Sequence, residues 1–308
     1  MTNILALQVD PLRDLNLQTD SSLALAFEAQ SRGYKVFTYQ PYSLVYRQEK
    51  FWATGLFIEL RDEGTSYVAS DESLLNLEEV SVILIRQDPP FDQRYMANTY
   101  LLELLEKRVK IINSPKGMRS ACEKVLPLQF PDFIPSTIIT EKAQAIYDFA
   151  REFESVIIKP LFAHGGRGVL KLERPSLSHI ETLLNLYHSS FPGPLVVQEY
   201  LKEIVKGDKR ILLIKGDPVA VFKRVPREGD IRSNLVQGGT AEACCLSKKD
   251  LDICAALKPT LQHLGLYLVG LDVIGDYLME VNVTSPTGLR AVEALYGIDV
   301  AKVFWDEL

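Results

Sequence analysis

Residues Val269–Arg290 have the sequence VGLDVIGDYLMEVNVTSPTGLR, and the rest of the chain is organised around this stretch. Two runs rich in Val, Ile and Leu flank the turn-forming residues Gly275 and Asp276, which predicts a β-hairpin. The strands also carry three oxygen-bearing side chains where the pattern otherwise reads as buried: Asp272, Glu280 and Asn282. Because an unpaired buried carboxylate is costly, this pattern indicates a bound hard metal ion.

The register of the hairpin decides whether these three side chains can meet. Glu280 and Asn282 are two residues apart and therefore share one face of their strand. Asp272 joins that face if the connection is a three-residue loop, Gly275–Tyr277, or if a strand contains a bulge; a regular two-residue loop would place it on the other face. A sheet edge with solvated polar residues is the alternative interpretation of the same stretch.

Length and composition define a globular protein with more than one unit. At 308 residues the chain is long for a single core, so we expect two or three subdomains. Hydrophobic residues make up 47% of the chain and charged residues 24%, as in ordinary soluble proteins. The 34 basic and 40 acidic residues give a net charge of −6, which argues against a nucleic-acid or anionic-membrane surface.

The N-terminus and the cysteines are typical of a cytoplasmic protein. No basic region precedes the apolar run Ile4–Val9, which is too short for a signal sequence or a membrane span. The cysteines show neither a CxxC motif nor metal-ligand spacing and are predicted to be reduced thiols: Cys122, Cys244, Cys245 and Cys254. The four histidines are scattered, which argues against a histidine-based metal or nucleophile site.

The N-terminal residues predict a βαβ unit. Ile4–Val9 reads as a strand, and Asp20 or Ser21 caps a helix that ends at Gly33. A second strand is expected at Lys35–Tyr39. These elements indicate the beginning of a parallel sheet.

A second pair of elements extends this sheet. Val80–Ile85 is continuously apolar, as in a parallel strand covered on both faces, and a helix at Tyr95–Lys107 and a strand at Val109–Ile112 follow. Ligands of open α/β sheets bind beyond the carboxyl ends of the strands, so Asp10 and Arg86 are substrate-side candidates. Simple surface charge would explain either residue taken alone.

A glycine-rich loop follows a strand that ends in a lysine. Ser155–Lys159 reads as the strand, and Ala163–Gly168 contains three glycines that allow backbone N–H groups to approach a phosphate. Lys159 adds a positive charge beside this loop. No GKS or GKT sequence ends the loop and no helix obviously follows, so it is not a Walker loop. A glycine-rich hairpin is the alternative interpretation.

A long polar segment follows two further strands. Leu195–Gln198 and Pro218–Val225 read as strands, and the basic sequence Gly207–Arg210 lies between them. Pro226–Ala241 then shows no helix or strand pattern, and a loop of this length is usually a functional lid or a disordered segment. The arginines in and beside this segment favour the interpretation that it is a lid closing on a bound anion. A helix at Lys248–Leu264 leads into the opening hairpin.

Several features of the chain agree: the lysines Lys124 and Lys159 on successive elements, the glycine loop, the basic strand, the lid and the carboxylate hairpin. With this combination, the chain resembles the ATP-grasp superfamily. Within it, the chain is similar from end to end to the prokaryotic glutathione synthetases. The resemblance rests on Asp10-Pro11, Asp20-Ser21-Ser22, Arg86–Asp92 (RQDPPFD), Glu123-Lys124, Ile158–Leu161, Gly207–Arg210, Asn234-Leu235, Gly238-Gly239 and Val281–Thr287. RQDPPFD and VNVTSPT are specific, whereas the basic GDKR and the Glu280/Asn282 pair are shared more widely among ATP-grasp ligases.

The resemblance implies an α/β fold, α+β in its C-terminal part, in which an ATP-grasp fold follows a Rossmann-like parallel-sheet domain. The implied domains are 1–122 for substrate binding, 123–192 as a small ATP-grasp subdomain, and 193–308 with the catalytic loop 226–241 and the metal hairpin. It also implies the reaction: ATP phosphorylates the C-terminal carboxylate of γ-glutamylcysteine, and glycine's amine attacks the acyl phosphate to give glutathione, ADP and phosphate. A closing lid would keep water from that acyl phosphate.

The resemblance also implies the residues of the site. ATP would contact Lys124, Lys159, Gly165, Gly166, Gln198, Glu199, Tyr200, Leu201, Asp208 and Arg210, with Glu199–Leu201 at the adenine edge and Asp208 at the ribose. Catalysis would use Arg210, Arg224, Arg232 and Gly239. The substrates would contact Asp10, Arg86, Asp88, Ser285, Thr287 and Arg290. Mg²⁺, or alternatively Mn²⁺, would be bound by Asp272, Glu280 and Asn282.

One stretch departs from the family pattern. Bacterial members usually read KPLDGMGG, where residues 159–166 here read KPLFAHGG. The difference alters the small loop that the resemblance places over the phosphates, and it bears on nucleotide affinity and on the choice of acceptor. A related ATP-grasp ligase that joins another acid to another amine is therefore the alternative function. A catalytically silent nucleotide-binding module is disfavoured, because the lysines, Arg210 and the metal residues are all present. Family resemblance further implies a homo-oligomer, specifically a homotetramer.

Overall fold

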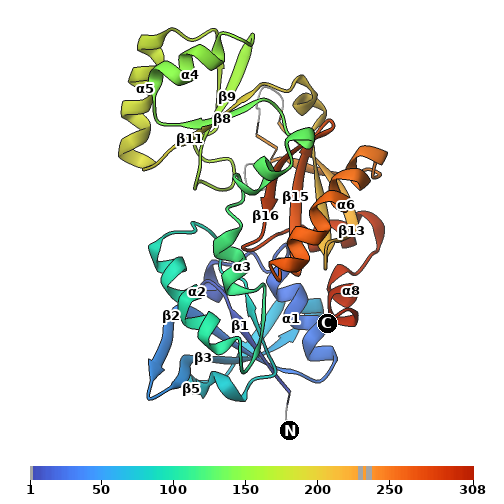
Figure 1. The fold of residues 1–308 in the computed structure, drawn as a ribbon. Helices are drawn as coiled ribbons and strands as arrows, with labels where there is room; N and C mark the ends of the chain where they lie inside the picture. The colour runs from blue at the N-terminus through green and yellow to red at the C-terminus, as the bar shows by residue number, and fades with distance from the viewer. Residues whose placement is uncertain (1–2, 228–231, 234–237) are drawn as a thin grey trace.

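The structure is a computed structural model that describes residues 3–227, 232–233 and 238–308. Figure 1 shows three parts, each built on its own β-sheet: a blue to cyan N-terminal part, a green and yellow middle part, and an orange and red C-terminal part between them. The fold is α/β in its N-terminal part and combines helices with antiparallel sheets in the rest of the chain, as expected. Among the described residues, no helix is both long and apolar enough to cross a membrane.

The N-terminal sheet has seven strands, and only four of them run parallel. The parallel strands are β1 (Ile4–Gln8), β2 (Lys35–Arg47), β6 (Val82–Ile85) and β7 (Lys110–Ile112), in the order β2-β1-β6-β7. The antiparallel strands are β3 (Lys50–Arg61), β4 (Ser66–Ala69) and β5 (Ser73–Asn76). The expected parallel strands are therefore present, and β3, β4 and β5 add an antiparallel extension to their sheet. The outer half of β2 contains Pro41 and is largely exposed, so its sequence lacks the apolar pattern of a buried strand.

Cap residues mark both ends of the first of the three helices in this part. The helices are α1 (Ser21–Ser31), α2 (Gln93–Leu105) and α3 (Pro115–Ser120). The Asp20 carboxylate accepts a hydrogen bond from the Leu23 backbone N–H at 2.8 Å, which makes Asp20 the N-cap of α1. Gly33 follows the helix with a φ of +87°, a conformation that favours glycine. Both positions agree with the sequence-based prediction.

The middle part is a four-stranded antiparallel sheet covered by two helices. Its strands are β8 (Thr137–Thr140), β9 (Ser155–Pro160), β10 (Leu170–Glu173) and β11 (Leu195–Glu199), in the order β10-β9-β11-β8. The helices are α4 (Ala143–Ala150) and α5 (Leu177–Ser190). Because β11 pairs with β8 and β9, this sheet continues beyond the expected boundary at residues 192/193. Hydrophobic pattern alone does not show which sheet a strand joins.

The C-terminal sheet has five antiparallel strands. They are β12 (Asp208–Ile214), β13 (Asp217–Val225), β14 (Thr240–Ala243), β15 (Leu268–Ile274) and β16 (Tyr277–Asn282), in the order β14-β13-β12-β15-β16. The helices are α6 (Lys248–His263), α7 (Leu289–Tyr296) and α8 (Val300–Asp306). Thr240 and Ala241 lie in β14, so the expected lid Pro226–Ala241 is shorter at its C-terminal end.

The C-terminus returns to the N-terminal part, where α8 packs beside α1 (Figure 1). The Trp305 indole N–H donates to the Leu25 carbonyl at 2.8 Å, and Arg32 pairs with Asp306 at 2.6 Å. Residues of both parts also share one buried apolar cluster. The N-terminal and C-terminal parts therefore share a hydrophobic core and hold the loops between them in fixed positions.

Candidate active site

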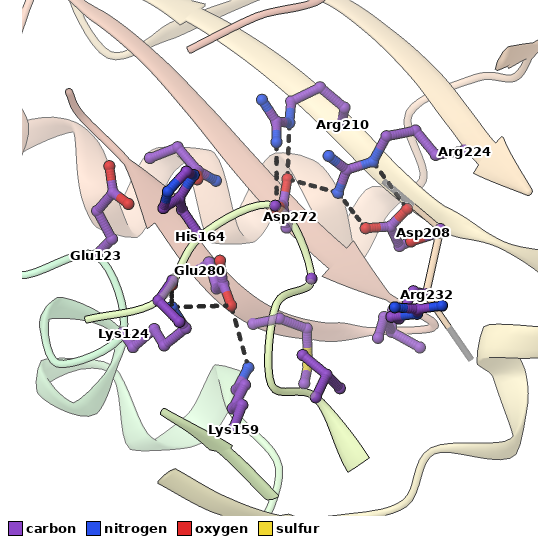
Figure 2. Close-up of a pocket in the computed structure, with 18 of the residues that line it drawn as sticks. Glu123, Lys124, Lys159, His164, Asp208, Arg210, Arg224, Arg232, Asp272 and Glu280 are labelled. Carbon is purple, nitrogen blue, oxygen red and sulfur yellow. Dashed lines mark hydrogen bonds and ion pairs between the residues drawn. The ribbon is translucent and has the colours of Figure 1, made fainter. Parts of the chain in front are cut away.

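A cavity lies between the four-stranded and the five-stranded sheets, and its walls come from all three parts of the chain. The middle sheet contributes Lys159 and Gln198, the C-terminal sheet contributes Arg210 and Glu280, and the N-terminal part contributes Asp88 at one end. Figure 2 shows charged side chains from facing elements pointing into this space. Segments separated by up to 200 residues in sequence thus form one polar site.

The hairpin β15–β16 contains the bulge on which the expected metal site depends. Ile274 pairs with Tyr277, so the loop has only two residues, but the register then shifts and Asp272 faces Glu280. Met279 is the extra residue on β16. Of the two sequence-based alternatives, the bulge is confirmed and the three-residue loop is wrong. Both carboxylates and Asn282 line the same cavity.

Asp272 lies between two arginines. Its carboxylate accepts from Arg210 Nε at 2.7 Å and from Arg210 Nη2 at 3.3 Å, while Arg224 Nη2 lies 3.0 Å from its Oδ1 (Figure 2). All three residues are buried. Burial by itself would raise the pKa of Asp272, but the two guanidinium groups lower it to about 2. Asp272 is therefore ionised whenever the protein is folded near neutral pH.

A second carboxylate completes this network. Asp208 accepts from Arg224 Nε at 3.0 Å and also from Arg224 Nη2. Burial opposes the charge of Arg224, but the carboxylates of Asp272 and Asp208 together raise its pKa above the usual value. Two acids and two arginines thus neutralise one another inside the protein. Asp208 is engaged by Arg224 in this structure, and a ribose contact would require it to share that interaction.

Glu280, on the other strand of the hairpin, faces two lysines. Glu280 Oε1 lies 3.3 Å from Lys159 Nζ and 3.9 Å from Lys124 Nζ. Lys124 Nζ also donates to the Ala163 carbonyl and, at 3.4 Å, to that of Leu161. Burial and the neighbouring Lys124 lower the pKa of Lys159, whereas Glu280 opposes this effect. The lysines are held close together although they repel each other, an arrangement that favours an added polyanion.

The glycine-rich loop lies over the same cavity. Gly165, Gly166 and Gly168 have φ values of +60°, +76° and +68°, a conformation that side chains with a Cβ rarely adopt. His164 beside them lines the cavity, and burial, Arg167 and Lys124 lower its pKa. A neutral histidine therefore occupies the position where this chain departs from the family sequence.

The far end of the cavity fits a planar base. Its apolar wall is formed by side chains from the two facing sheets and the segments next to them: Ile157, Val169, Leu201, Ile204 and Met279. Gln198 is 5% exposed and donates to Thr137 Oγ1 at 3.0 Å, but its side-chain oxygen has no partner among the described residues. A buried acceptor without a donor is costly, so a ligand with an N–H group, such as the exocyclic amine of adenine, fits this position.

This acceptor gives a direct test of nucleotide binding. Gln198→Leu is expected to weaken ATP binding about 10-fold, because one hydrogen bond to a buried acceptor contributes about 1.4 kcal/mol. Calorimetric titration of the purified protein with ATP measures the dissociation constant. Gln144→Leu is the control, since Gln144 is exposed on α4 and bonds only to Asp148 among the described residues. An unchanged affinity in Gln198→Leu would place the base elsewhere.

Most of the expected site residues line the cavity. For the nucleotide they are Lys124, Lys159, Gly165, Gly166, Gln198, Glu199, Tyr200, Leu201, Asp208 and Arg210. For catalysis, substrate and metal they are Arg224, Arg232, Asp88, Ser285, Thr287, Asp272, Glu280 and Asn282. Asp10, Arg86, Gly239 and Arg290 are not in the described lining. The first two lie directly behind it, since Asp10 accepts from the Asp88 backbone N–H at 2.6 Å and Arg86 donates to the Pro286 carbonyl at 2.9 Å.

Two of the expected residues occupy different surroundings. Arg290 pairs with Glu293 at 2.9 Å and donates to the Glu63 carbonyl, in a second cavity beside α1 and α8. The structure therefore does not bring it to Ser285 and Thr287, the other residues expected to contact substrate. Gly239 packs against backbone, and a Cβ at this position would lie 2.2 Å from the Ser233 carbonyl oxygen. Its observed constraint is therefore steric.

The expected lid is described only in part. Residues 228–231 and 234–237, including Asn234-Leu235, lie outside the described residues. Arg232 and Ser233 line the cavity, and Arg227 Nε donates to the Gly238 carbonyl at 3.1 Å. Residues 232–233 of the expected lid therefore line the cavity, and its two flanks are joined by the hydrogen bond between Arg227 and Gly238.

Sequence-based reasoning assigned no role to Glu123. This residue lines the cavity, and its carboxylate contacts the segment that follows β16. Burial raises its pKa, whereas Lys124 and the hydrogen bonds from Thr284 and Val283 oppose the shift. The only available signal was its place next to Lys124 in a family motif.

The donor set of the hairpin fits magnesium bound together with phosphates. In the described part of the chain, no group of three or more His, Cys, Asp or Glu side chains is placed to hold a metal. Asp272, Glu280 and Asn282 instead offer two carboxylates and an amide, and Asn282 Nδ2 donates to the Gly270 carbonyl at 3.2 Å, which leaves its oxygen as the ligand atom. Mg²⁺ commonly uses one or two carboxylates plus substrate phosphates, so the residues fit that ion.

Solved structures with the same fold define the class of protein. D-cycloserine synthetase DcsG superposes with a TM-score of 0.68 at 15% identity, covering 99% of this chain and 98% of that one. D-alanyl-alanine synthetase A from Vibrio cholerae superposes with a TM-score of 0.61 at 12% identity, covering 100% and 97%. At these identities the likeness concerns the fold. The chain has the fold of an ATP-grasp ligase.

Sequence comparison gives the particular family. The prokaryotic glutathione synthetase N-terminal domain matches residues 4–119, and the ATP-grasp domain of the same family matches residues 123–297. The glutathione synthetase of Brucella melitensis is 42% identical and that of Mesorhizobium japonicum 41%, each match covering 98% of this chain and 96% of the relative. The chain belongs to the prokaryotic glutathione synthetase family and is an ATP-dependent ligase, which confirms the resemblance inferred from its motifs.

Proposed function

We propose that the protein joins γ-glutamylcysteine to glycine at the expense of ATP, giving glutathione, ADP and phosphate. The observation that carries the proposal is one cavity in which two lysines face Glu280 and two arginines face Asp272, in a chain that matches this family along nearly its full length. Phosphoryl transfer needs positioning and charge neutralisation more than covalent help from the protein. The cavity supplies both.

The positive side chains would each contact a different part of the polyanion. Lys124 and Lys159 would contact the phosphates of ATP beneath the glycine loop, and Arg210 would contact the γ-phosphate. Arg224 and Arg232 lie farther along the same wall and would stabilise the acyl phosphate. Charge-assisted contacts of this kind are shorter and stronger than neutral ones.

The hairpin would hold the metal ion. Asp272, Glu280 and Asn282 would be the protein ligands for Mg²⁺, with Mn²⁺ as the alternative ion. When bound, the ion neutralises charge on the phosphates and favours attack by the substrate carboxylate. The chain's own contribution is to align these oxygens through the Met279 bulge. The arginines beside Asp272 and the lysines beside Glu280 keep both carboxylates compensated before nucleotide binds.

The peptide substrate would bind at the end of the cavity that Asp88, Ser285 and Thr287 line. Burial raises the pKa of Asp88, and Arg86 partly offsets the effect. Arg86 is already bonded to Pro286 and Ser22, so we assign it to support of this wall. Asp10 supports it in the same way. The proposed domains remain an N-terminal substrate unit followed by the two ATP-grasp units.

Substrate dependence tests the proposed reaction. Purified protein with ATP and Mg²⁺ is expected to release phosphate when γ-glutamylcysteine and glycine are both present, and to release little when either is omitted. Phosphate assay combined with product mass distinguishes ligation from hydrolysis. Turnover of another acid and amine, with this pair untouched, would preserve the ligase class and reject the named reaction; the loop Phe162–His164 would then be the first segment to exchange.

The remaining assignments concern the state of the protein. We propose a homotetramer in the cytoplasm, where the four free thiols and the thiol-bearing substrate would stay reduced. Light scattering coupled to gel filtration measures the particle mass. A mass equal to one chain would reject the tetramer without affecting the proposed reaction.

A further inference from the structure

The segment between α3 and the middle sheet runs alongside the end of β16. The Glu123 backbone carbonyl accepts from the Val281 backbone N–H at 2.9 Å. Its side-chain Oε1 accepts from the Val283 N–H at 3.0 Å, from the Thr284 N–H at 3.3 Å and from Thr284 Oγ1 at 2.9 Å. One residue thus holds the backbone on both sides of Asn282.

Glu123 is also next to the lysine that faces the metal hairpin. Lys124 Nζ lies 3.9 Å from Glu280 Oε1 and donates to the Ala163 carbonyl in the glycine-rich loop. The backbone of residues 123–124 therefore connects three features of the cavity: the metal-binding strand, the phosphate-facing lysine and the small loop. A change in Glu123 alters their relative positions without removing any of them.

The segment that Glu123 holds is fixed elsewhere by residues of the N-terminal part. Asn113 Nδ2 donates to the Val283 carbonyl at 2.7 Å, Arg86 Nη2 donates to the Pro286 carbonyl at 2.9 Å, and the Ser21 hydroxyl accepts from the Gly288 N–H at 3.1 Å. Of these four anchoring residues, Glu123 alone lines the cavity. It is therefore the one of the four whose own side chain borders the cavity.

We propose that Glu123 is a positioning residue, which fixes Asn282–Thr284 relative to Lys124 so that the metal site and the substrate wall form one rigid unit. The inference rests on the proposed function. Three donors converge on one carboxylate oxygen, so the required property is an acceptor at that point. Its action passes through Asn282, Thr284 and Lys124, and it need not touch the reacting atoms.

Two substitutions separate the acceptor from the charge. Glu123→Gln retains an oxygen for the three donors and loses only the charge, whereas Glu123→Ala leaves those donors unpaired. We expect Glu123→Ala to raise the Mg²⁺ concentration needed for half-maximal ATP binding about 10-fold and to raise the KM for the peptide about 10-fold, whereas ATP affinity without metal changes less than about 3-fold. Glu123→Gln is expected to recover most of both losses.

Calorimetry of ATP binding across a Mg²⁺ series measures the first effect, and steady-state kinetics measures the second. Thr284→Val removes one donor from the other side of the contact and should shift both quantities in the same direction by a smaller factor, so the test stands even if Glu123→Ala fails to fold. Glu106→Gln is the matched control, because Glu106 is half-buried, has a pKa raised by burial and bonds to Ser114 away from the cavity. It should behave as the unmodified protein.

Three results would overturn the inference. A normal Mg²⁺ dependence in Glu123→Ala would show that the contact positions nothing, and so would no shift in Thr284→Val. Equal losses in Glu123→Gln and Glu123→Ala would show that the charge acts directly. Failure of the proposed reaction has a different signature: unmodified protein would bind ATP with Mg²⁺ and leave γ-glutamylcysteine and glycine unligated.

Discussion

Glu280→Gln is expected to lower kcat by about 10³-fold while the protein remains folded. The amide keeps the shape of the side chain but removes a charge that faces the cavity, 3.3 Å from Lys159 Nζ. Loss of a single preorganised electrostatic group at a site of phosphoryl transfer commonly costs about 10²–10³-fold. Because Glu280 already pairs with lysines before any ligand binds, the substitution should also destabilise the free protein slightly and should not stabilise it.

Phosphate release under saturating ATP, Mg²⁺, γ-glutamylcysteine and glycine measures kcat, and thermal unfolding checks the fold. Glu242→Gln is the control, since Glu242 pairs with Lys223 at 2.8 Å on β14, outside the described lining of the cavity. A surface ion pair contributes about 0–1 kcal/mol, so this variant should keep its activity. Normal turnover in Glu280→Gln would remove Glu280 from the metal site.

Asp272→Asn is expected to lower the free energy of unfolding by about 3 kcal/mol at neutral pH, in addition to abolishing activity. The substitution leaves Arg210 without its acid partner and Arg224 with only Asp208, and removing one member of a buried ion pair typically costs about 3–5 kcal/mol. Urea denaturation measures the difference. Asp217 lies on the same sheet and forms an exposed ion pair with Lys258 of α6. Asp217→Asn should therefore lower the free energy of unfolding by less than about 1 kcal/mol.

The effect of Asp272 should also depend on pH in a defined direction. Arg210 and Arg224 lower its pKa from the ordinary value of 3.8 to about 2 in the folded protein, so the folded state favours the ionised form. The stability it contributes is fully present above the unfolded value and is lost as the pH falls through the folded value. The difference between the unmodified protein and Asp272→Asn should therefore be constant from about pH 5 to 8 and shrink below about pH 4. A difference that grew on acidification would contradict the pairing.

Local sequence chemistry was sufficient for the secondary structure around the site. The Val-, Ile- and Leu-rich runs in Val269–Arg290 and the turn residues Gly275 and Asp276 predicted the hairpin, and Asp20 and Gly33 marked the ends of the first helix. These signals act over a few residues, because strand period, turn geometry and capping depend on the immediate neighbours. Family motifs added the fold class and the reaction.

Sequence order could not place residues whose partners are distant. Arg86 and Arg290 both read as carboxylate-binding arginines, yet Arg86 is bonded to Pro286, 200 positions away, and Arg290 to Glu63, 227 positions away. Part of β2 was missed for a related reason. The outer half of β2 pairs with β3 although its side chains remain mostly exposed. Its sequence therefore lacks the apolar pattern that would indicate a strand.

The sequence by itself therefore determined the hairpin, its three oxygen-bearing residues, the lysines and the family to which the chain belongs. Only the tertiary structure decided that a bulge at Met279 sets Asp272 opposite Glu280, that Arg224 joins Asp272 to Asp208, and that Glu123 holds the strand beside Asn282. The physical reason is that hydrogen bonds and ion pairs are short-ranged and need defined geometry. Glu123 and Thr284, 161 positions apart in the chain, come within 2.9 Å only in the folded protein.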